Sequence, residues 1–129
     1  MITYKRLDLT PLKKAYEKLV EYMKHNKREQ DQTAIVKTFE YCFELSWKMM
    51  KKLLENEGIT EATSPKFTLI TAGRLGILED VEIWFDFLEK RNKTSHVYDE
   101  VVLEEIMQVM PKFKSELRTL IKVLVERNK

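Results

Sequence analysis

The longest apolar pattern in the sequence runs from Ile35 to Leu54 and has the spacing of an α-helix. Residues three or four positions apart fall on one face of a helix. The apolar stripe is made of Ile35, Val36, Phe39, Cys42, Phe43, Trp47, Met50, Leu53 and Leu54. Gly58 is the expected stop, because glycine readily adopts the backbone conformation that ends helices. We expect this segment to be the central helix of the core.

A helix is also predicted ahead of this segment. Thr10 is predicted to be the N-cap and Pro11 the first helical residue. Apolar residues at helical spacing follow them. This helix is expected to end near residues 24–26. Residues 27–32 read as a polar connection, and residues 1–9 as a loose arm.

Three further helices are predicted from their caps. Ser64 precedes a proline and opens a short helix that Gly76 is expected to end. Asp80 and Asp99 are expected to cap the last two helices. Pro111 falls inside the last one and is expected to kink or break it, because proline lacks a backbone donor and clashes with the preceding turn.

Length and composition agree with an all-α protein. The chain has 129 residues, of which 43% are hydrophobic, and contains only three glycines and three prolines. That length accommodates one hydrophobic core, so we predict a single domain over residues 1–129. Short connections favour antiparallel neighbours, and the predicted fold is a four- to five-helix up-and-down bundle.

The charge is nearly balanced overall but uneven along the chain. The net charge of +2 gives no strong signal for nucleic acid or membrane binding. Residues 75–110 carry nine acids and three bases, and all three bases lie between Lys90 and Lys93. A small basic cluster is therefore expected within acidic surroundings.

The single cysteine, Cys42, excludes an internal disulfide and has apolar neighbours that predict a buried thiol. The first residues lack a continuous apolar stretch, and no segment approaches the length of a membrane span. We therefore expect a cytoplasmic protein that does not enter the membrane.

Several kinds of chemistry have no motif in this chain. Two histidines and one cysteine, far apart in sequence, predict no metal site. A glycine-rich phosphate loop is absent, as is the Gly-Ser and Asp-x-Asp pair of nucleotide-transferring enzymes. We expect no cofactor in this chain, and any nucleotidyl transfer would need carboxylates from a partner.

The densest polar segment is residues 91–98, where Arg91, Asn92, Ser95, His96 and Tyr98 lie close together. Arginine offers a charged fork for phosphate, histidine exchanges a proton near neutral pH, and asparagine can hold a hydroxyl or the imidazole. These groups suffice for RNA cleavage without a metal. On a continuous helix Arg91 and His96 would point about 140° apart, so their convergence requires a helix end. The alternative is structural: Arg91 paired with a nearby acid and His96 capping a helix.

Arg91-Asn92, three residues, then His96-Val97-Tyr98 resembles the Arg-x4-His-x-Tyr signature of HEPN-domain proteins. Residues 39–48, Ser64-Pro65, residues 72–78 and Trp84 resemble the nucleotidyltransferase substrate-binding protein family, a branch of the HEPN superfamily. Residues 73–76 depart from the family's usual run at that place.

The resemblance implies a dimerising helical bundle and a neighbouring minimal nucleotidyltransferase that uses ATP or another nucleotide with Mg²⁺. It also implies two roles. In one, the protein presents substrate to the nucleotidyltransferase. In the other, the pair is a toxin–antitoxin system, in which the protein is a HEPN ribonuclease and the partner silences it by adenylylating the tyrosine that matches Tyr98.

Three hypotheses follow. The first is a binding partner and substrate of a minimal nucleotidyltransferase, with Tyr98 as the modification site. The second is a metal-independent ribonuclease in which Arg91, Asn92 and His96 are catalytic and RNA is the ligand. The third is a structural dimerisation module that retains the motif.

Supporting residues for the first two hypotheses are Glu40, Glu44 and Ser95. Glu40 and Glu44 lie one turn apart on the central helix, where a carboxylate could pair with Arg91 and orient it. Solvated surface carboxylates are the other interpretation of these two residues. Ser95 is included because it lies beside His96.

Overall fold

The computed structural model describes residues 6–128, and within them every regular element is helical. The elements are α1 (Thr10–Met23), α2 (Glu29–Asn56), α3 (Pro65–Arg74), α4 (Val81–Asn92), the 3₁₀ turn η1 (Thr94–His96) and α5 (Glu100–Arg127). The predicted all-α fold is confirmed. None of the helices in this range is both long enough and apolar enough to cross a lipid bilayer.

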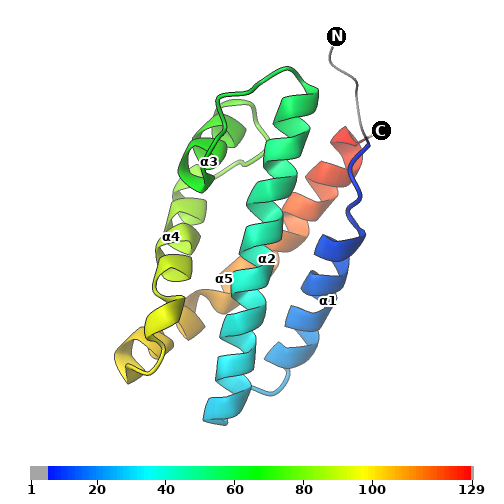
Figure 1. Cartoon of the computed structure of the whole chain (residues 1–129). Helices are drawn as coiled ribbons and strands as arrows, with labels where there is room; N and C mark the ends of the chain where they lie inside the picture. The colour runs from blue at the N-terminus through cyan, green and yellow to red at the C-terminus, as the bar shows by residue number, and fades with distance from the viewer. Residues whose placement is uncertain (1–5, 129) are drawn as a thin grey trace.

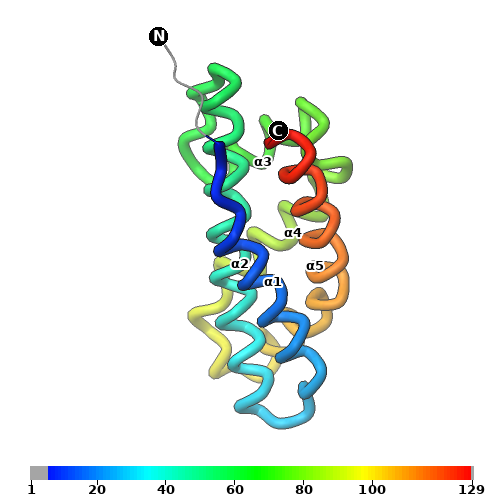
Figure 2. The backbone as a smooth tube through the Cα atoms, turned by 90° about the vertical axis from the view of Figure 1, so that its right-hand side faces the viewer, coloured from blue at the N-terminus to red at the C-terminus, as the bar shows by residue number. Residues whose placement is uncertain are grey.

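The helices α1, α2, α4 and α5 form an up-and-down bundle, with the short α3 beside α4 (Figure 1). The central role predicted for α2 is confirmed, because α2 packs against each of the other four α-helices. The turn η1 joins α4 to α5 at the end of the bundle away from the last turn of α5, as the two views together show (Figure 2).

Five buried aromatic rings tie α2, α4 and α5 together: Phe39, Phe43, Trp84, Phe87 and Phe113. The Phe113 ring meets the rings of Phe39 and Phe87 edge-on, with centroids 4.7 and 5.0 Å apart. Edge-to-face packing of this kind adds to the stability gained by burial. It also anchors α4, the helix that carries Arg91, against α2.

The residues just before α1 are not a loose arm. Leu7 and Leu9 are buried, and the Leu7 backbone exchanges two hydrogen bonds with the Asn128 side chain, at 2.8 and 2.9 Å. The prediction was therefore wrong for residues 7–9, because their partner lies at the far end of the sequence. Residues 1–5 of the predicted arm lie outside the described range.

The cap predictions hold for α3, α4 and α5, where Ser64, Asp80 and Asp99 each accept backbone hydrogen bonds with their side chains. The prediction for α1 was wrong. Thr10 is the first helical residue and Leu9 is the N-cap, because the Asp8 carboxylate accepts the Thr10 N–H at 3.0 Å and starts the turn earlier.

The start of α2 and the course of α5 at Pro111 also differ from the prediction. The helix α2 begins at Glu29, inside the predicted polar connection, because the Glu29 and Asp31 carboxylates favour a helix N-terminus and Asp31 pairs with Arg28. Pro111 does not break α5, which runs without interruption from residue 100 to residue 127. Gly58 and Gly76 follow helix ends with φ of 85° and 77°, as expected of glycine stops.

Candidate functional site

The polar segment 91–98 is built as a sequence of tight turns. The helix α4 ends at Asn92, and η1 follows one residue later. The Thr94 hydroxyl donates to the Arg91 carbonyl at 2.8 Å and so satisfies one of the open acceptors at the end of α4. The backbone N–H of His96 then donates to the Lys93 carbonyl at 2.9 Å. The helix end that the convergence of Arg91 and His96 requires is therefore present.

Arg91 turns toward α2 because it continues the buried face of α4. Trp84, Phe87 and Arg91 are spaced by three and four residues, so they lie along one side of the helix. The Arg91 Nη2 group donates to Glu44 Oε1 across the interface with α2. The predicted pairing of Arg91 with a carboxylate of the central helix is observed for Glu44.

The Glu44 carboxylate also contacts two residues of its own helix, α2. Its Oε2 atom accepts a hydrogen bond from the Trp47 indole at 3.2 Å and lies 4.0 Å from the Lys48 ammonium. The ion pair is half-buried, with Arg91 and Glu44 side chains 32% and 26% exposed. Arg91 Nε is buried and has no hydrogen-bond partner in the described part of the chain.

His96 and Tyr98 form a second contact on the outer surface. The His96 Nδ1 atom and the Tyr98 hydroxyl are 3.1 Å apart, and the two rings meet edge-on. Tyr98 is 80% exposed, which is unusual for a large aromatic side chain. An exposed phenol beside an imidazole can lose its proton to that imidazole.

The other candidate residues make fewer polar contacts than Arg91 or His96. Asn92 is exposed and meets Arg91 Nη1 only at 3.4 Å. Ser95 is exposed and makes no side-chain hydrogen bond within residues 6–128. Glu40 is partly buried and has no polar partner in that range. Within it, no hydrogen bond joins Arg91 to His96, so the structure contains two separate pairs.

The other bases of the cluster are neutralised by its acidic surroundings. Lys90 lies 2.8 Å from Asp86, while Lys93 bridges Glu89 at 3.3 Å and Glu105 at 3.4 Å. Hydrogen bonds from the Lys93 ammonium to Glu89, then to Glu105, raise the pKa of Lys93. Of the three basic residues in this cluster, only Arg91 turns away from these acids and toward α2.

Sequence reasoning missed the contribution of Trp47, which was expected to serve only the core. Trp47 packs against the core and also fixes Glu44 through its indole nitrogen. The spacing of three residues between Glu44 and Trp47 on one helix was the available signal. Cys42 is buried as predicted, and burial raises the pKa of its thiol to about 12. The described residues contain no group of side chains suited to hold a metal ion.

Taken together, these features define a class of helical bundle with a half-buried arginine–glutamate pair and an exposed histidine–tyrosine pair at one end. The family model described as nucleotidyltransferase substrate binding protein like matches residues 7–126. The chain therefore belongs to the nucleotidyltransferase substrate-binding protein family, as the sequence motifs indicated.

A relative in Haemophilus influenzae, described as a probable ribonuclease HepT, is 33% identical over 97 residues. The matched region covers 72% of this chain and 66% of the relative.

Two solved structures share the fold, each with a TM-score of 0.81 and 26% sequence identity. A crystal structure from Thermus thermophilus covers 88% of this chain and is itself matched over 98%. The other, from Haemophilus influenzae, is described as revealing the fold of a substrate binding domain of a nucleotidyltransferase, and covers 91% of this chain and 98% of its own.

Proposed function

We propose that this protein binds a minimal nucleotidyltransferase and that Tyr98 accepts a nucleotidyl group from it. The observation that carries the proposal is the exposed Tyr98 hydroxyl 3.1 Å from His96 Nδ1. Family membership and the related substrate-binding fold support a nucleotidyltransferase as the partner. A nucleotidyl acceptor must reach into another protein's active site, and a nearly fully exposed phenol is suited to that.

The proposed step is a substitution at phosphorus. The Tyr98 oxygen attacks the α-phosphorus of ATP, the bond to the β-phosphate oxygen breaks, and pyrophosphate leaves. The phenolic proton passes to His96 Nδ1, which acts as general base. The partner supplies the carboxylates that hold Mg²⁺, which neutralises the phosphates and the leaving group.

Binding is the first test of this function. The nucleotidyltransferase encoded by a neighbouring gene is purified, mixed with this protein and analysed by size-exclusion chromatography with light scattering. We expect a stable complex, and we expect the homodimer implied by the family when the protein is alone. Absence of both complex formation and nucleotidyl transfer with that partner would refute the proposed function.

A second candidate function is metal-independent cleavage of RNA, which the ion pair that holds Arg91 against Glu44 and the description of the Haemophilus relative favour. His96 would take the proton of the ribose 2′-hydroxyl, whose oxygen attacks the adjacent phosphorus while the 5′-oxygen leaves. Arg91, whose side chain is partly exposed and has Asn92 beside its Nη1 group, would stabilise the charge on phosphorus. A two-fold dimer would bring two such segments into one cleft.

This second function is tested by incubating the protein with labelled RNA in the presence of a chelator. Cleavage by the wild type that is lost in His96→Ala would support it. Intact RNA with a folded, dimeric preparation would count against it, and this result would leave the proposed role of Tyr98 unaffected.

A further inference from the structure

A groove of about 1080 Å³ lies between α1 and α2, on a different part of the surface from residues 91–98. All its lining residues come from α1, α2 and the residues just before α1. Its volume lies just above the usual range of about 300–1,000 Å³ for small-molecule sites. Neither the proposed nucleotidyl transfer nor the proposed RNA cleavage uses it.

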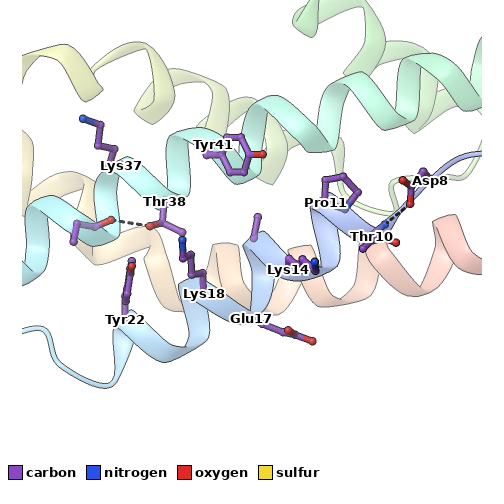
Figure 3. Close-up of a pocket in the computed structure, with 12 residues that line it drawn as sticks. Asp8, Thr10, Pro11, Lys14, Glu17, Lys18, Tyr22, Lys37, Thr38 and Tyr41 are labelled. Atoms are coloured by element: carbon purple, nitrogen blue, oxygen red, sulfur yellow. Dashed lines mark hydrogen bonds between the residues drawn. The ribbon is translucent and has the colours of Figure 1, made fainter.

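Three lysines line the groove from its two sides. Lys14 and Lys18 are four residues apart on α1, and Lys37 lines the groove from α2 with its side chain directed away from α1 (Figure 3). Within residues 6–128, Lys18 and Lys37 have neither an ion pair nor a side-chain hydrogen bond. The pKa of Asp8 is lowered mainly by hydrogen bonds from Thr10, and also by the positive charge of the Lys14 ammonium. Two positive charges are therefore available to an anionic ligand.

Two exposed tyrosines extend the same rows of side chains. Tyr22 lies four residues after Lys18 on α1, and Tyr41 lies four residues after Lys37 on α2, so each lysine and its tyrosine share a helix face (Figure 3). Tyr41 is 56% exposed and Tyr22 is 38% exposed. The groove thus combines unpaired ammonium groups with accessible aromatic rings.

The acidic residues of the groove lie at its margins. Asp8 lies at one end beside Thr10, whose backbone N–H it accepts, and Glu17 points away from α2 (Figure 3). The space between Lys18, Lys37 and Tyr41 is free of carboxylates among the lining residues. Phosphate groups in this space would meet attraction without direct repulsion.

We propose that the groove between α1 and α2 binds single-stranded RNA. Proteins that hold single strands combine a positively charged groove along the backbone with aromatic side chains on which bases stack. Lys18 and Lys37 would contact phosphates, and Tyr41, with Tyr22 toward the other end, would stack on bases. This proposal stands whether or not Tyr98 accepts a nucleotide.

Charge decides between RNA and a second copy of the chain as the occupant. A two-fold pairing through this groove would place the same surface, with three lysines and two carboxylates, on both sides of the contact, so both faces would carry a net positive charge. Like charges at such a contact oppose association. A phosphate backbone instead releases its counterions when lysines neutralise it.

The test uses a fluorescein-labelled 2′-O-methyl RNA of about 12 nucleotides, which resists cleavage through the 2′-hydroxyl and falls within the usual site size of single-strand binders. Its binding to the full chain is followed by fluorescence anisotropy. We expect Lys18→Glu/Lys37→Glu to weaken binding at least tenfold and to reduce the salt slope by about 1.4, because each phosphate contact contributes about 0.7. The matched control is Lys66→Glu/Lys122→Glu, two exposed lysines outside the groove with no ion pair in the described range.

Stacking is tested separately at Tyr41. We expect Tyr41→Ala to weaken binding at least about fivefold and Tyr41→Phe to restore it, because phenylalanine keeps the aromatic face. Gln108→Ala, at an exposed position of α5 outside the groove, should bind this RNA as the wild type does. Competition by free AMP at equal phosphate concentration would mean that a mononucleotide, not a strand, is the ligand, and would overturn the proposal.

Two further results would also overturn it. One is equal weakening in the groove variant and in the matched control, which would reduce the effect to net charge. The other is that the wild type does not bind the RNA. If Lys18→Glu/Lys37→Glu then also fails to form the complex with the nucleotidyltransferase, these lysines belong to a protein contact.

Discussion

Glu44 on α2 and Arg91 on α4 are 47 positions apart in the sequence, and their side chains form a half-buried ion pair. The indole of Trp47 holds the carboxylate from the other side. A guanidinium fixed in this way is already oriented before a ligand arrives. Binding a phosphate then loses less side-chain entropy. We therefore propose that Glu44 positions Arg91.

Breaking this pair is expected to destabilise the fold. Glu44→Gln should lower the free energy of unfolding by about 1–3 kcal/mol, because it leaves a partly buried guanidinium without its counter-charge. In a urea-denaturation cycle with Arg91→Gln, the coupling should reach about 1 kcal/mol or more. Glu40→Gln, one turn away and without a polar partner among residues 6–128, is the control and should stay within about 0.5 kcal/mol. Additive effects of the Glu44 and Arg91 changes would contradict the assignment.

The connection between the two ends of the chain gives a second prediction. Asn128→Ala should cost about 1–3 kcal/mol of stability, because the buried N–H and carbonyl of Leu7 would lose both hydrogen bonds. Chemical denaturation measures this, with Gln108→Ala on the exposed side of α5 as the control. Equal denaturation midpoints for the two variants would show that this connection contributes nothing.

The buried thiol gives a prediction about pH. Burial raises its pKa from 9.0 to about 12, so the thiolate fraction of native Cys42 at pH 8 should be roughly a thousandfold below that of a free thiol. Iodoacetamide should therefore modify Cys42 only as fast as the protein opens. Rapid alkylation in native buffer, followed by mass spectrometry, would contradict this.

The raised pKa of Cys42 has a definite sign for stability. The folded state keeps the proton that the unfolded state releases, so this contribution is complete below pH 9 and is lost as the pH rises toward 12. Between those values the loss should approach about 1.4 kcal/mol for each pH unit. Cys42→Ala should show a flatter decline above pH 9 than the wild type.

Local signals predicted much of the fold correctly. Ser64, Asp80 and Asp99 cap their helices through atoms only two or three residues away, so a short stretch of sequence contains all the information. The prediction of the α1 cap was wrong because of another local contact. Asp8, two residues before Thr10, accepts the hydrogen bond of the Thr10 N–H.

Long-range contacts were harder to predict. The Leu7 backbone is hydrogen-bonded to the side chain of Asn128, 121 positions away, and no local pattern contains that information. The sequence left the partner of Arg91 open between Glu40 or Glu44 of the central helix and a nearby acid such as Asp86 or Glu89. The level at which α4 packs on α2 selects Glu44. The contact of His96 with Tyr98 needed the 3₁₀ turn, which the sequence reasoning did not predict.

His96 should accelerate nucleotidyl transfer if it accepts the Tyr98 proton. We expect His96→Ala to slow transfer from the partner by roughly 10²-fold, the usual contribution of a general base, with little change in affinity for the partner. Glu104→Ala, at an exposed position of α5, is the control. A transfer rate that is unchanged in His96→Ala would remove the histidine from the mechanism.

The proposed role of Tyr98 is tested most directly by mass spectrometry after incubation with the neighbouring nucleotidyltransferase, ATP and Mg²⁺. We predict AMP on the peptide that carries Tyr98 and none on Tyr98→Phe, although Tyr41 and Tyr22 are also exposed. AMP on Tyr41 or another side chain, or an unmodified protein in the presence of an active and bound partner, would contradict the proposal.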